Sequence, residues 1–435
     1  MTTALLTDHY ELTMLEGARR AGTADRQCVF ELFARRLPDG RRYGVVAGVG
    51  RALQAIEEFR FDADTIDHLA EHRVVDQDTL DWLAGYRFSG NVWGYPEGEI
   101  YFPGSPVLVV EGTFAESVLL ETVLLSIYNH DSAIASAASR MTVAAGDRPC
   151  IEMGSRRTHE QSAVAAARAA YVAGFRATSN LEAGRRFGIP TTGTAAHSFT
   201  LLHDSERDAF AAQLAALGED TTLLVDTYDV MEAVRVGVEL TGGRLGAVRL
   251  DSGDLGLIAA RVRELLDSLG ARDTKIIVTS DLDEWQIASL ASAPVDGYGV
   301  GTSLVTGSGH PTCGFVYKLV SRSTSTDRDA PLRPVAKKSQ DKASIGGRKV
   351  ALRRLEEGVA TAEVIAIERP TGGDFDDREL LVPLVHDGET VHGGSLAEAR
   401  DRHLRSRAEL PMDATKLSRG EPVIATTYLE TEHVH

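Results

Sequence analysis

The sequence predicts an α/β protein in which a parallel sheet, closed or nearly closed into a barrel, is joined to a mixed α+β domain. Three observations carry this prediction. Short apolar stretches alternate with helical patterns across residues 150–300. The first 115 residues instead combine helices with alternating, proline- and glycine-rich stretches. The 435 residues also exceed one ordinary domain.

Composition excludes several classes of protein. The net charge of −17 speaks against a nucleic-acid or anionic-membrane partner. Three distant cysteines, Cys28, Cys150 and Cys313, speak against a disulfide framework or a Cys-based zinc site and fit a reducing compartment. The first residues carry no basic stretch, and no apolar run approaches a membrane span of about 18 residues. We therefore expect a cytoplasmic protein without a membrane anchor.

The N-terminal region reads as a mixed domain of residues 1–115. Thr7 or Asp8 can cap its first helix, and its last part alternates in the way of antiparallel strands. The expected elements are a helix within 1–20, a strand at 27–33, a loop at 37–50, a helix at 51–73 and antiparallel strands within 90–112.

Residues 116–349 are expected to form the barrel domain, opening with one or two helices at 115–145. The expected strands are 150–154, 177–180, 192–196, 222–227, 246–250, 275–279 and 297–300. The expected helices are 159–174, 181–187, 205–217, 229–240, 254–269 and 283–292. Periodicity does not decide whether these strands close into a barrel.

The last region continues with a strand at 313–320 and a polar loop at 321–333. Residues 350–435, with strands near 363–367 and 379–385 and a charged helix at 395–409, are expected to fold back on the N-terminal domain. A basic cluster precedes them and is either a solvated surface or a phosphate gate: Lys337, Lys338, Lys342, Arg348 and Lys349.

The clearest indication of a ligand-binding site is in residues 246–256, which have the sequence GAVRLDSGDLG. Arg249 and Asp251 stand where a buried strand ends and a helix begins, an edge at which α/β proteins bind ligands. Asp251 and Asp254 could instead only cap the helix. Other strand ends repeat the pattern with Arg156, Arg157, Ser179, Asn180, His197, Ser198, Asp226, Asp229, Ser280, Asp281, Gly299, Gly301, Thr302 and Ser303. Together they predict one site at the barrel mouth, whose last, glycine-rich strand end suits phosphate.

Familiar nucleotide and metal motifs are missing. There is no GxxxxGK[ST] loop, and His159-Glu160 is not part of HExxH. Residues 223–230, LLVDTYDV, resemble only faintly the signature of doubly wound phosphoribosyltransferases, because the adjacent acid pair is missing.

Six motifs in order give the chain a resemblance to the nicotinate phosphoribosyltransferase family along nearly its whole length. They begin at Thr7 (TDHYEL), Gly154 (GSRR), Thr178 (TSN), Gly193 (GTAAHS), Val248 (VRLDSGD) and Gly299 (GVGTS), and Tyr317-Lys318-Leu319 and Lys337-Lys338-Ser339 also fit. The resemblance implies an irregular α/β barrel of about seven strands plus an open-faced α+β domain built from both chain ends. It further implies a homodimer whose active sites include the N-terminal tyrosine segment of the other subunit.

The resemblance implies a reaction as well. Nicotinate and phosphoribosyl pyrophosphate give nicotinate mononucleotide and pyrophosphate, with hydrolysis of ATP coupled through a phosphohistidine, in NAD salvage. By resemblance that histidine is His197, and a neutral imidazole is a competent phosphoryl acceptor. From the residues alone, a hydrogen-bonding residue at a strand end is the favoured interpretation of His197.

The expected roles follow the charges of this reaction. Asp251 would bind ribose hydroxyls or Mg²⁺, which takes up charge on the leaving pyrophosphate, and Arg249 would bind a phosphate. Gly299, Gly301 and Thr302 would hold the 5′-phosphate, with Lys318 as a further phosphate ligand. Arg156 and a stacking Tyr10 would orient the pyridine ring, next to Ser198. Asp226 and Asp281 are weaker acidic candidates.

Substrate choice is expected to depend on Ser179 and Asn180. Enzymes that look similar but use nicotinamide carry an acid at the position of Asn180, which would repel the carboxylate of nicotinate. Two alternatives stay open: a nicotinamide phosphoribosyltransferase, and a non-catalytic phosphoribosyl- or nucleotide-binding regulator. One departure from the family is Ser344–Arg348, where a Pro-Gly pair is usual.

Overall fold

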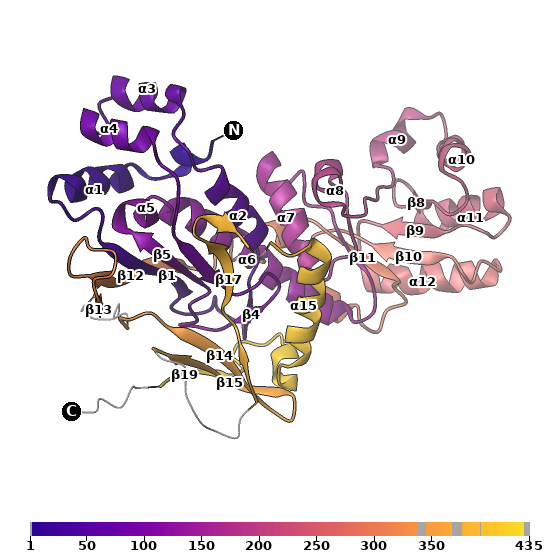
Figure 1. Ribbon diagram of the computed structural model, residues 1–435. Coiled ribbons are helices and arrows are strands. Elements are labelled where there is room, and N and C mark those ends of the chain that lie inside the picture. Colours follow the sequence, from indigo (N-terminus) through magenta and orange to yellow (C-terminus); the bar gives the residue numbers. More distant parts are fainter. Residues whose placement is uncertain (1, 338–344, 368–375, 392, 430–435) are drawn as a thin grey trace. The chain divides into compact units, whose positions relative to one another are not determined.

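The computed structural model describes residues 2–337, 345–367, 376–391 and 393–429 (Figure 1). The chain divides into two compact units, which are described separately below. Unit 1 comprises Met1–Ala133 and Thr312–His435, and unit 2 comprises Ile134–Pro311. The domain limits expected from the sequence, after residues 115 and 349, stay a prediction.

Unit 1 is built around a seven-stranded antiparallel sheet with the order β13-β12-β1-β5-β3-β17-β18. Its strands are β1 (Gln27–Ala34), β3 (Asn91–Gly94), β5 (Leu108–Thr113), β12 (Phe315–Ser323), β13 (Leu332–Pro334), β17 (Val382–His386) and β18 (Glu389–Thr390). Because β17 pairs with β3, the C-terminal tail does fold back on the N-terminal strands, as expected.

Two smaller sheets and most of the remaining helices complete unit 1. The first sheet has the order β16-β14-β15-β19, with β14 (Val350–Glu356), β15 (Val359–Ala366), β16 (Asp376–Glu379) and β19 (Ala425–Leu429). The second pairs β2 (Gly44–Val45) with β4 (Ile100–Tyr101). The helices are η1 (Ala4–Leu6), α1 (His9–Arg20), α2 (Val49–Glu57), α3 (Ala63–Glu71), α4 (Gln77–Ala84), α5 (Phe114–Val118), α15 (Leu396–Ala408), η2 (Met412–Thr415) and the first part of α6 (Glu121–Ala145).

Three local expectations for unit 1 are wrong. The single helix at 51–73 is two helices, because the Asp62 side chain accepts a hydrogen bond from the Thr65 amide and starts α3 anew. The loop at 37–50 contains β2 and the start of α2. The loop at 321–333 begins as the end of β12 and finishes in β13.

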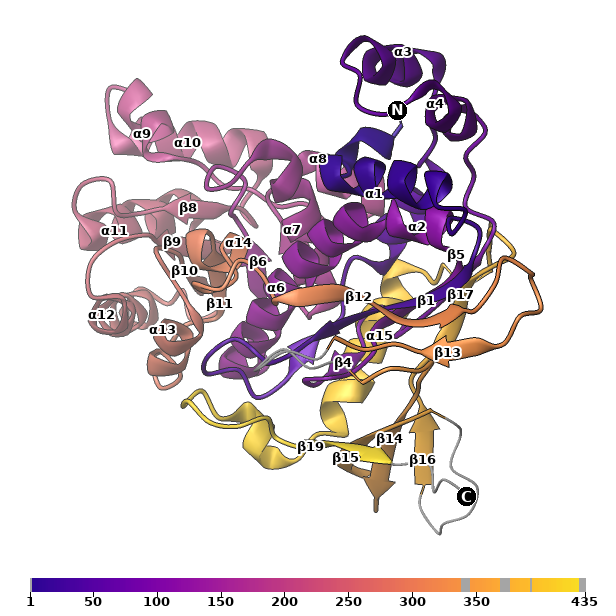
Figure 2. The same ribbon diagram turned by 90° about the vertical axis from the view of Figure 1, so that its left-hand side faces the viewer.

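Unit 2 contains a six-stranded parallel sheet with the order β7-β6-β11-β10-β9-β8. Its strands are β6 (Cys150–Glu152), β7 (Ala177–Thr178), β8 (Thr222–Leu224), β9 (Ala247–Leu250), β10 (Lys275–Val278) and β11 (Gly297–Val300). The helices are α7 (Glu160–Val172), α8 (Leu181–Phe187), α9 (His197–Leu202), α10 (Glu206–Leu217), α11 (Val230–Thr241), α12 (Leu255–Ser268), α13 (Glu284–Ser289) and α14 (Thr302–Val305). Figure 2 shows α10, α11 and α12 around the outside of strands β8–β10.

The α/β barrel architecture is confirmed, but the expected strand at 192–196 does not form. A single bridge, Thr178↔Thr191, is what remains of its pairing with β7. The segment is polar and exposed around Thr192 and Gly193, so it offers little apolar surface to bury as a strand. The sheet therefore has six hydrogen-bonded strands, and β7 and β8 are its open edges among the described residues.

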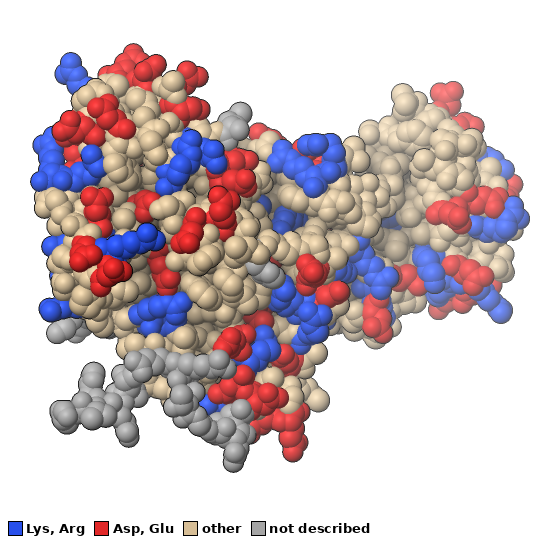
Figure 3. Space-filling model, in the orientation of Figure 1, with Lys and Arg blue, Asp and Glu red and all other residues tan. Residues whose placement is uncertain are grey.

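Within the described ranges, no helix combines the length and apolar character needed to cross a membrane. On the face shown in Figure 3, acidic and basic side chains are interspersed.

Candidate active site

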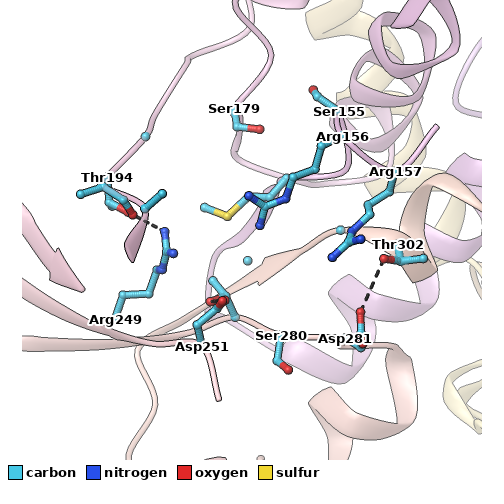
Figure 4. Close-up of a pocket in the computed structure, with 17 residues that line it drawn as sticks. Ser155, Arg156, Arg157, Ser179, Thr194, Arg249, Asp251, Ser280, Asp281 and Thr302 are labelled. Carbon is cyan, nitrogen blue, oxygen red and sulfur yellow. Dashed lines mark hydrogen bonds between the residues drawn. The ribbon is translucent and has the colours of Figure 1, made fainter. Parts of the chain in front are cut away.

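A cavity of about 410 Å³ lies in unit 2 at the carboxyl ends of the parallel strands (Figure 4). Every sheet strand except β8 contributes its end or the loop after it, as expected for an α/β barrel. The lining residues are Met153, Ser155, Arg156, Arg157, Ser179, Gly193, Thr194, Ala195, Ala196, Arg249, Asp251, Thr279, Ser280, Asp281, Gly299, Gly301 and Thr302. The structure thus brings together ten of the residues predicted at the strand ends: Arg156, Arg157, Ser179, Arg249, Asp251, Ser280, Asp281, Gly299, Gly301 and Thr302.

The loop after β6 brings two cations to this cavity. Arg156 and Arg157 are exposed and point into it (Figure 4). Among the described residues, neither guanidinium has an ion-pair or hydrogen-bond partner. Cations without protein partners are suited to an anionic ligand.

A buried carboxylate that sequence reasoning missed supports this loop. Glu152 is fully buried and accepts hydrogen bonds from the Gly154 amide and the Thr178 hydroxyl, so it links the ends of β6 and β7. Burial raises the pKa of Glu152, and these two hydrogen bonds oppose the rise. An acid inside the apolar stretch at 150–153 was the available signal.

The end of β9 supplies a cation and a carboxylate, as predicted. Arg249 Nη1 donates a hydrogen bond to Thr194 Oγ1 at 2.6 Å, whereas its buried Nε has no partner in the described part of the chain. Burial lowers the pKa of Arg249, and the charges of Asp251 and Asp226 oppose this. The Asp251 carboxylate accepts a hydrogen bond from Thr279 Oγ1.

Asp254, in contrast, does not line the cavity. Its Oδ1 accepts a hydrogen bond from the Leu257 amide at 3.1 Å and caps α12, so the capping interpretation holds for this residue.

The ends of β10 and β11 continue the cavity wall next to β9. Ser280 has a φ of 115°, a region that non-glycine residues rarely adopt, and next to it Asp281 accepts a 3.5 Å hydrogen bond from Thr302. A Cβ on Gly299 would lie 2.5 Å from Thr279 Cγ2 and 2.8 Å from Met153 Sδ. Glycine is therefore needed there for the strand ends to approach each other.

His197 lies at the start of α9, directly after the lining residues 193–196. Its Nδ1 is 3.1 Å from Thr227 Oγ1, and its Nε2 is 3.9 Å from Asp226 Oδ1. Asp226 in turn accepts hydrogen bonds from the Asp251 amide (3.1 Å) and from Ser252 Oγ (2.6 Å). Asp226, a weaker candidate in the sequence, thus connects His197 to the cavity wall.

Two further predicted residues lie beside the cavity without lining it. Asn180 Oδ1 accepts from the Ala183 amide and caps α8, while its Nδ2 donates to Ser155 Oγ at 2.9 Å. Asn180 therefore reaches the cavity through Ser155. Ser198 is exposed in the first turn of α9.

Tyr10 and Lys318 belong to unit 1, where both act on Glu121. Burial raises the pKa of Glu121, whereas the Lys318 charge and a hydrogen bond from Tyr10 oppose the rise. Burial and the charge of Glu121 raise the pKa of Tyr10 to about 12. These two of the residues that the resemblance assigns to the substrate site therefore share Glu121 as an interaction partner.

The basic cluster is only partly described, because Lys338, Lys342 and Ser339 lie outside the described residues. Lys349 is buried and pairs with Glu31 at 2.7 Å, and Arg348 pairs with Glu111. These two members are structural ion pairs of unit 1 and are not free for phosphate.

The side chains available as metal ligands limit how a metal ion could bind. Within the described residues, no group of three or more His, Cys, Asp or Glu side chains could hold a metal ion. Asp251 and Asp281 nevertheless face the same cavity. One or two carboxylates, completed by ligand phosphates and water, is the usual arrangement for Mg²⁺, so these residues fit that ion.

Comparisons with known proteins agree with this geometry. A family model described as the nicotinate phosphoribosyltransferase N-terminal domain matches residues 5–129. A nicotinate phosphoribosyltransferase of Mycobacterium tuberculosis is 56% identical over 97% of this chain and 94% of its own length. One of Bacillus subtilis is 39% identical over 73% of this chain and 66% of its own. The crystal structure of human nicotinic acid phosphoribosyltransferase matches with a TM-score of 0.83 at 25% identity, covering 98% of both chains.

An irregular α/β barrel with arginines, carboxylates and close-packed glycines at its strand ends defines an enzyme of the phosphoribosyltransferase class. Within that class, the full-length identity is decisive. This chain belongs to the nicotinate phosphoribosyltransferase family.

Proposed function

We propose that this enzyme makes nicotinate mononucleotide and pyrophosphate from nicotinate and phosphoribosyl pyrophosphate in NAD salvage, with ATP as co-substrate. The observation that carries the proposal is the cavity itself: three arginines and two carboxylates meet at the strand ends of a barrel shared with nicotinate phosphoribosyltransferases. Both substrates are anions, and Arg156, Arg157 and Arg249 supply the complementary charge.

The phosphoribosyl group is assigned to the wall formed by β9, β10 and β11. Gly299, Gly301 and Thr302 allow the 5′-phosphate to approach the backbone, and Asp251 accepts from the ribose hydroxyls. Asp251, with Asp281, would also hold Mg²⁺, which neutralises charge on the leaving pyrophosphate. Breaking the bond from C1 to pyrophosphate leaves positive charge on the sugar, and the Asp251 carboxylate stabilises it.

Nicotinate is assigned to the side of Arg156 and Ser179, with Tyr10 stacking on the ring and Lys318 binding phosphate. Tyr10 and Lys318 belong to unit 1, whereas Arg156 and Ser179 belong to unit 2. We infer a homodimer with shared active sites. Mixing Tyr10→Ala with His197→Ala subunits tests this, since hybrid dimers with shared sites recover part of the activity and separate sites recover none.

His197 is the proposed phosphoryl acceptor. The carboxylate 3.9 Å from Nε2 favours the tautomer with its proton on Nε2, so Nδ1 keeps the lone pair. Nδ1 attacks the γ-phosphorus of ATP, the bond to the bridging oxygen breaks, and ADP leaves. Water later cleaves the P–N bond and releases phosphate. Asp226 stabilises the positive ring that forms in between.

The buried thiols fit a reducing compartment, and we propose that the enzyme acts in the cytoplasm. Cys28, Cys150 and Cys313 are all buried, and none of them forms a disulfide. Burial raises the pKa of Cys28 and of Cys150 to about 12, so both stay protonated and unreactive.

The direct test is mononucleotide formation from phosphoribosyl pyrophosphate and Mg²⁺ with nicotinate, nicotinamide or quinolinate, each with and without ATP. The proposal expects product from nicotinate, increased by ATP. Product from nicotinamide instead would support the first alternative, and no product from any base would support the regulator.

A further inference from the structure

Thr194 connects two proposed site residues, Arg249 and His197. Its hydroxyl accepts the 2.6 Å hydrogen bond from Arg249 Nη1 and lies 3.4 Å from the carbonyl oxygen of Ala195, to which it can donate. Ala195 lies two residues before His197. One hydroxyl thus contacts both the guanidinium of the cavity wall and the backbone that leads to the phosphoryl acceptor.

The segment around Thr194 has few other restraints. At one end, the Thr192 amide bonds to the Thr178 carbonyl at 3.0 Å, and at the other the Phe199 amide bonds to the Ala196 carbonyl at 2.9 Å. Among residues 192–196, the Thr194 hydroxyl makes the side-chain hydrogen bonds found in the described chain, and His197 follows with its own contact to Thr227 Oγ1. Because no strand ladder forms here, the position of this backbone depends strongly on that hydroxyl.

Arg249 depends on Thr194 as well. The hydrogen bond uses Nη1 and leaves the buried Nε without a partner in the described part of the chain. A buried donor without a partner is costly, and a ligand that supplies an acceptor removes that cost. The edge formed by Nε and Nη2 suits a carboxylate or phosphate held by two hydrogen bonds, provided that Nη1 stays fixed.

We propose that Thr194 is a positioning residue that couples the anion site at Arg249 to His197. Its hydroxyl holds the guanidinium ready for an anionic substrate and, through the Ala195 carbonyl, sets the backbone before His197. The inference rests on the proposed function and goes beyond it, since it assigns the link between substrate binding and the use of ATP.

Two substitutions at Thr194 separate the hydroxyl from the shape of the side chain. Thr194→Val keeps the branched shape but cannot hydrogen-bond, whereas Thr194→Ser keeps the hydroxyl. Thr192→Val is the matched control, because it makes the same change in the same segment at a side chain that does not line the cavity. Near-identical thermal unfolding of the variants would show that all of them fold.

We expect Thr194→Val to raise the KM of the anionic substrate bound by Arg249 about tenfold, the effect of one hydrogen bond to a charged group. We also expect the stimulation of mononucleotide synthesis by ATP to fall by a similar factor. Thr194→Ser should recover both quantities, and Thr192→Val should resemble wild type.

Three results would overturn the inference. They are an unchanged Thr194→Val enzyme, equal defects in Thr194→Ser and Thr194→Val, and a raised KM with full stimulation by ATP. Wild-type enzyme measured in parallel keeps the two questions apart. A wild type without mononucleotide synthesis would refute the proposed function itself, whereas an active wild type with an unaffected Thr194→Val refutes only the role of Thr194.

Discussion

At the scale of single residues, the proposed reaction depends on which side chains the strand ends hold in place. Asp226 shows this best, because one carboxylate oxygen bonds to the Asp251 amide and to Ser252 while the other faces His197. That second oxygen is buried and has no hydrogen-bond partner in the described chain. A buried carboxylate oxygen that faces an imidazole is expected to stabilise positive charge on that ring.

Replacing Asp226 with Asn should therefore weaken the use of ATP. The neutral amide cannot stabilise a positively charged ring. We therefore expect stimulation by ATP to fall about 10- to 100-fold, the size of effect found when a hydrogen-bonding partner of a metal-binding histidine is replaced. The measurement is the rate of mononucleotide synthesis with and without ATP. Asp254→Asn is the matched control, because asparagine also caps a helix well. Full stimulation by ATP in Asp226→Asn would refute this role.

Gly299 allows a second prediction at this scale. Gly299→Ala adds a methyl group against Thr279 and Met153 and should lower the free energy of unfolding by about 1–3 kcal/mol. Gly193 also lines the cavity, but a Cβ there meets nothing within 4 Å. Gly193→Ala is therefore expected to unfold in urea close to wild type. Equal stability of the two variants would show that the strand ends have room to separate.

At the scale of elements, a buried ionic network joins the C-terminal strands to β4 in unit 1. Arg353 of β14 is fully buried and donates to Glu363 of β15 at 2.7 Å and to the Ile100 carbonyl at 2.9 Å. Glu363 also accepts from Tyr95 at 2.7 Å. Each charge is compensated only while the others stay in place.

Arg353→Met should consequently cost about 3–5 kcal/mol of unfolding free energy, because it leaves the buried Glu363 without its cation. Its neighbour Arg354 pairs with Asp377 nearer the surface, at 3.1 Å. Arg354→Met is expected to cost less than about 1 kcal/mol. Urea unfolding of both variants measures the difference, and similar losses would contradict the network.

Helix α15 contributes a pH dependence. Burial, with the nearby positive Arg407, lowers the pKa of His403 to about 3. The unfolded chain binds a proton at this residue below about pH 6.5, whereas the folded chain stays neutral until about pH 3. The contribution of His403 to the free energy of unfolding is therefore fully present above pH 6.5 and is lost as the pH falls toward 3.

His403→Leu should remove this part of the pH dependence. Its free energy of unfolding should fall less than that of wild type between pH 6.5 and 4, measured by urea unfolding at each pH. His386→Leu replaces an exposed histidine and is the control. Parallel curves for wild type and His403→Leu would show that His403 is not held neutral.

The elements predicted from the sequence are correct where the hydrophobic pattern and the local chemistry of the residues indicate the same element. The apolar strands and amphipathic helices of residues 150–300 were found almost completely, because parallel strands are buried on both faces. The prediction was wrong at 192–196, where the sequence TGTAA offers little apolar surface to bury as a strand. It was also wrong at 51–73, where the Asp62 side chain starts a second helix. The polar residues at the strand ends were sufficient to predict the site. Glu152 was missed, because a single buried acid leaves no periodic pattern in the sequence.

At the scale of the whole molecule, both units contain residues that we propose to take part in the reaction. Unit 2 holds the cavity, His197 and the three arginines, while unit 1 holds Tyr10 and Lys318 beside Glu121. Spatial proximity within unit 1 could not be read from the sequence, since Tyr10 and Lys318 are 308 positions apart by their numbering. Membership of the family is shown by the similarity along the whole chain, whereas the proposed coupling to ATP is argued from the surroundings of His197.

The most direct test of this account compares mononucleotide synthesis from nicotinate by wild type and by His197→Ala, with and without ATP. The same samples are incubated with ATP that carries a labelled γ-phosphate. We expect ATP to increase the rate of wild type and to label it, and His197→Ala to show neither effect. Equal stimulation by ATP in both proteins, or a labelled His197→Ala, would show that His197 does not carry the phosphoryl group.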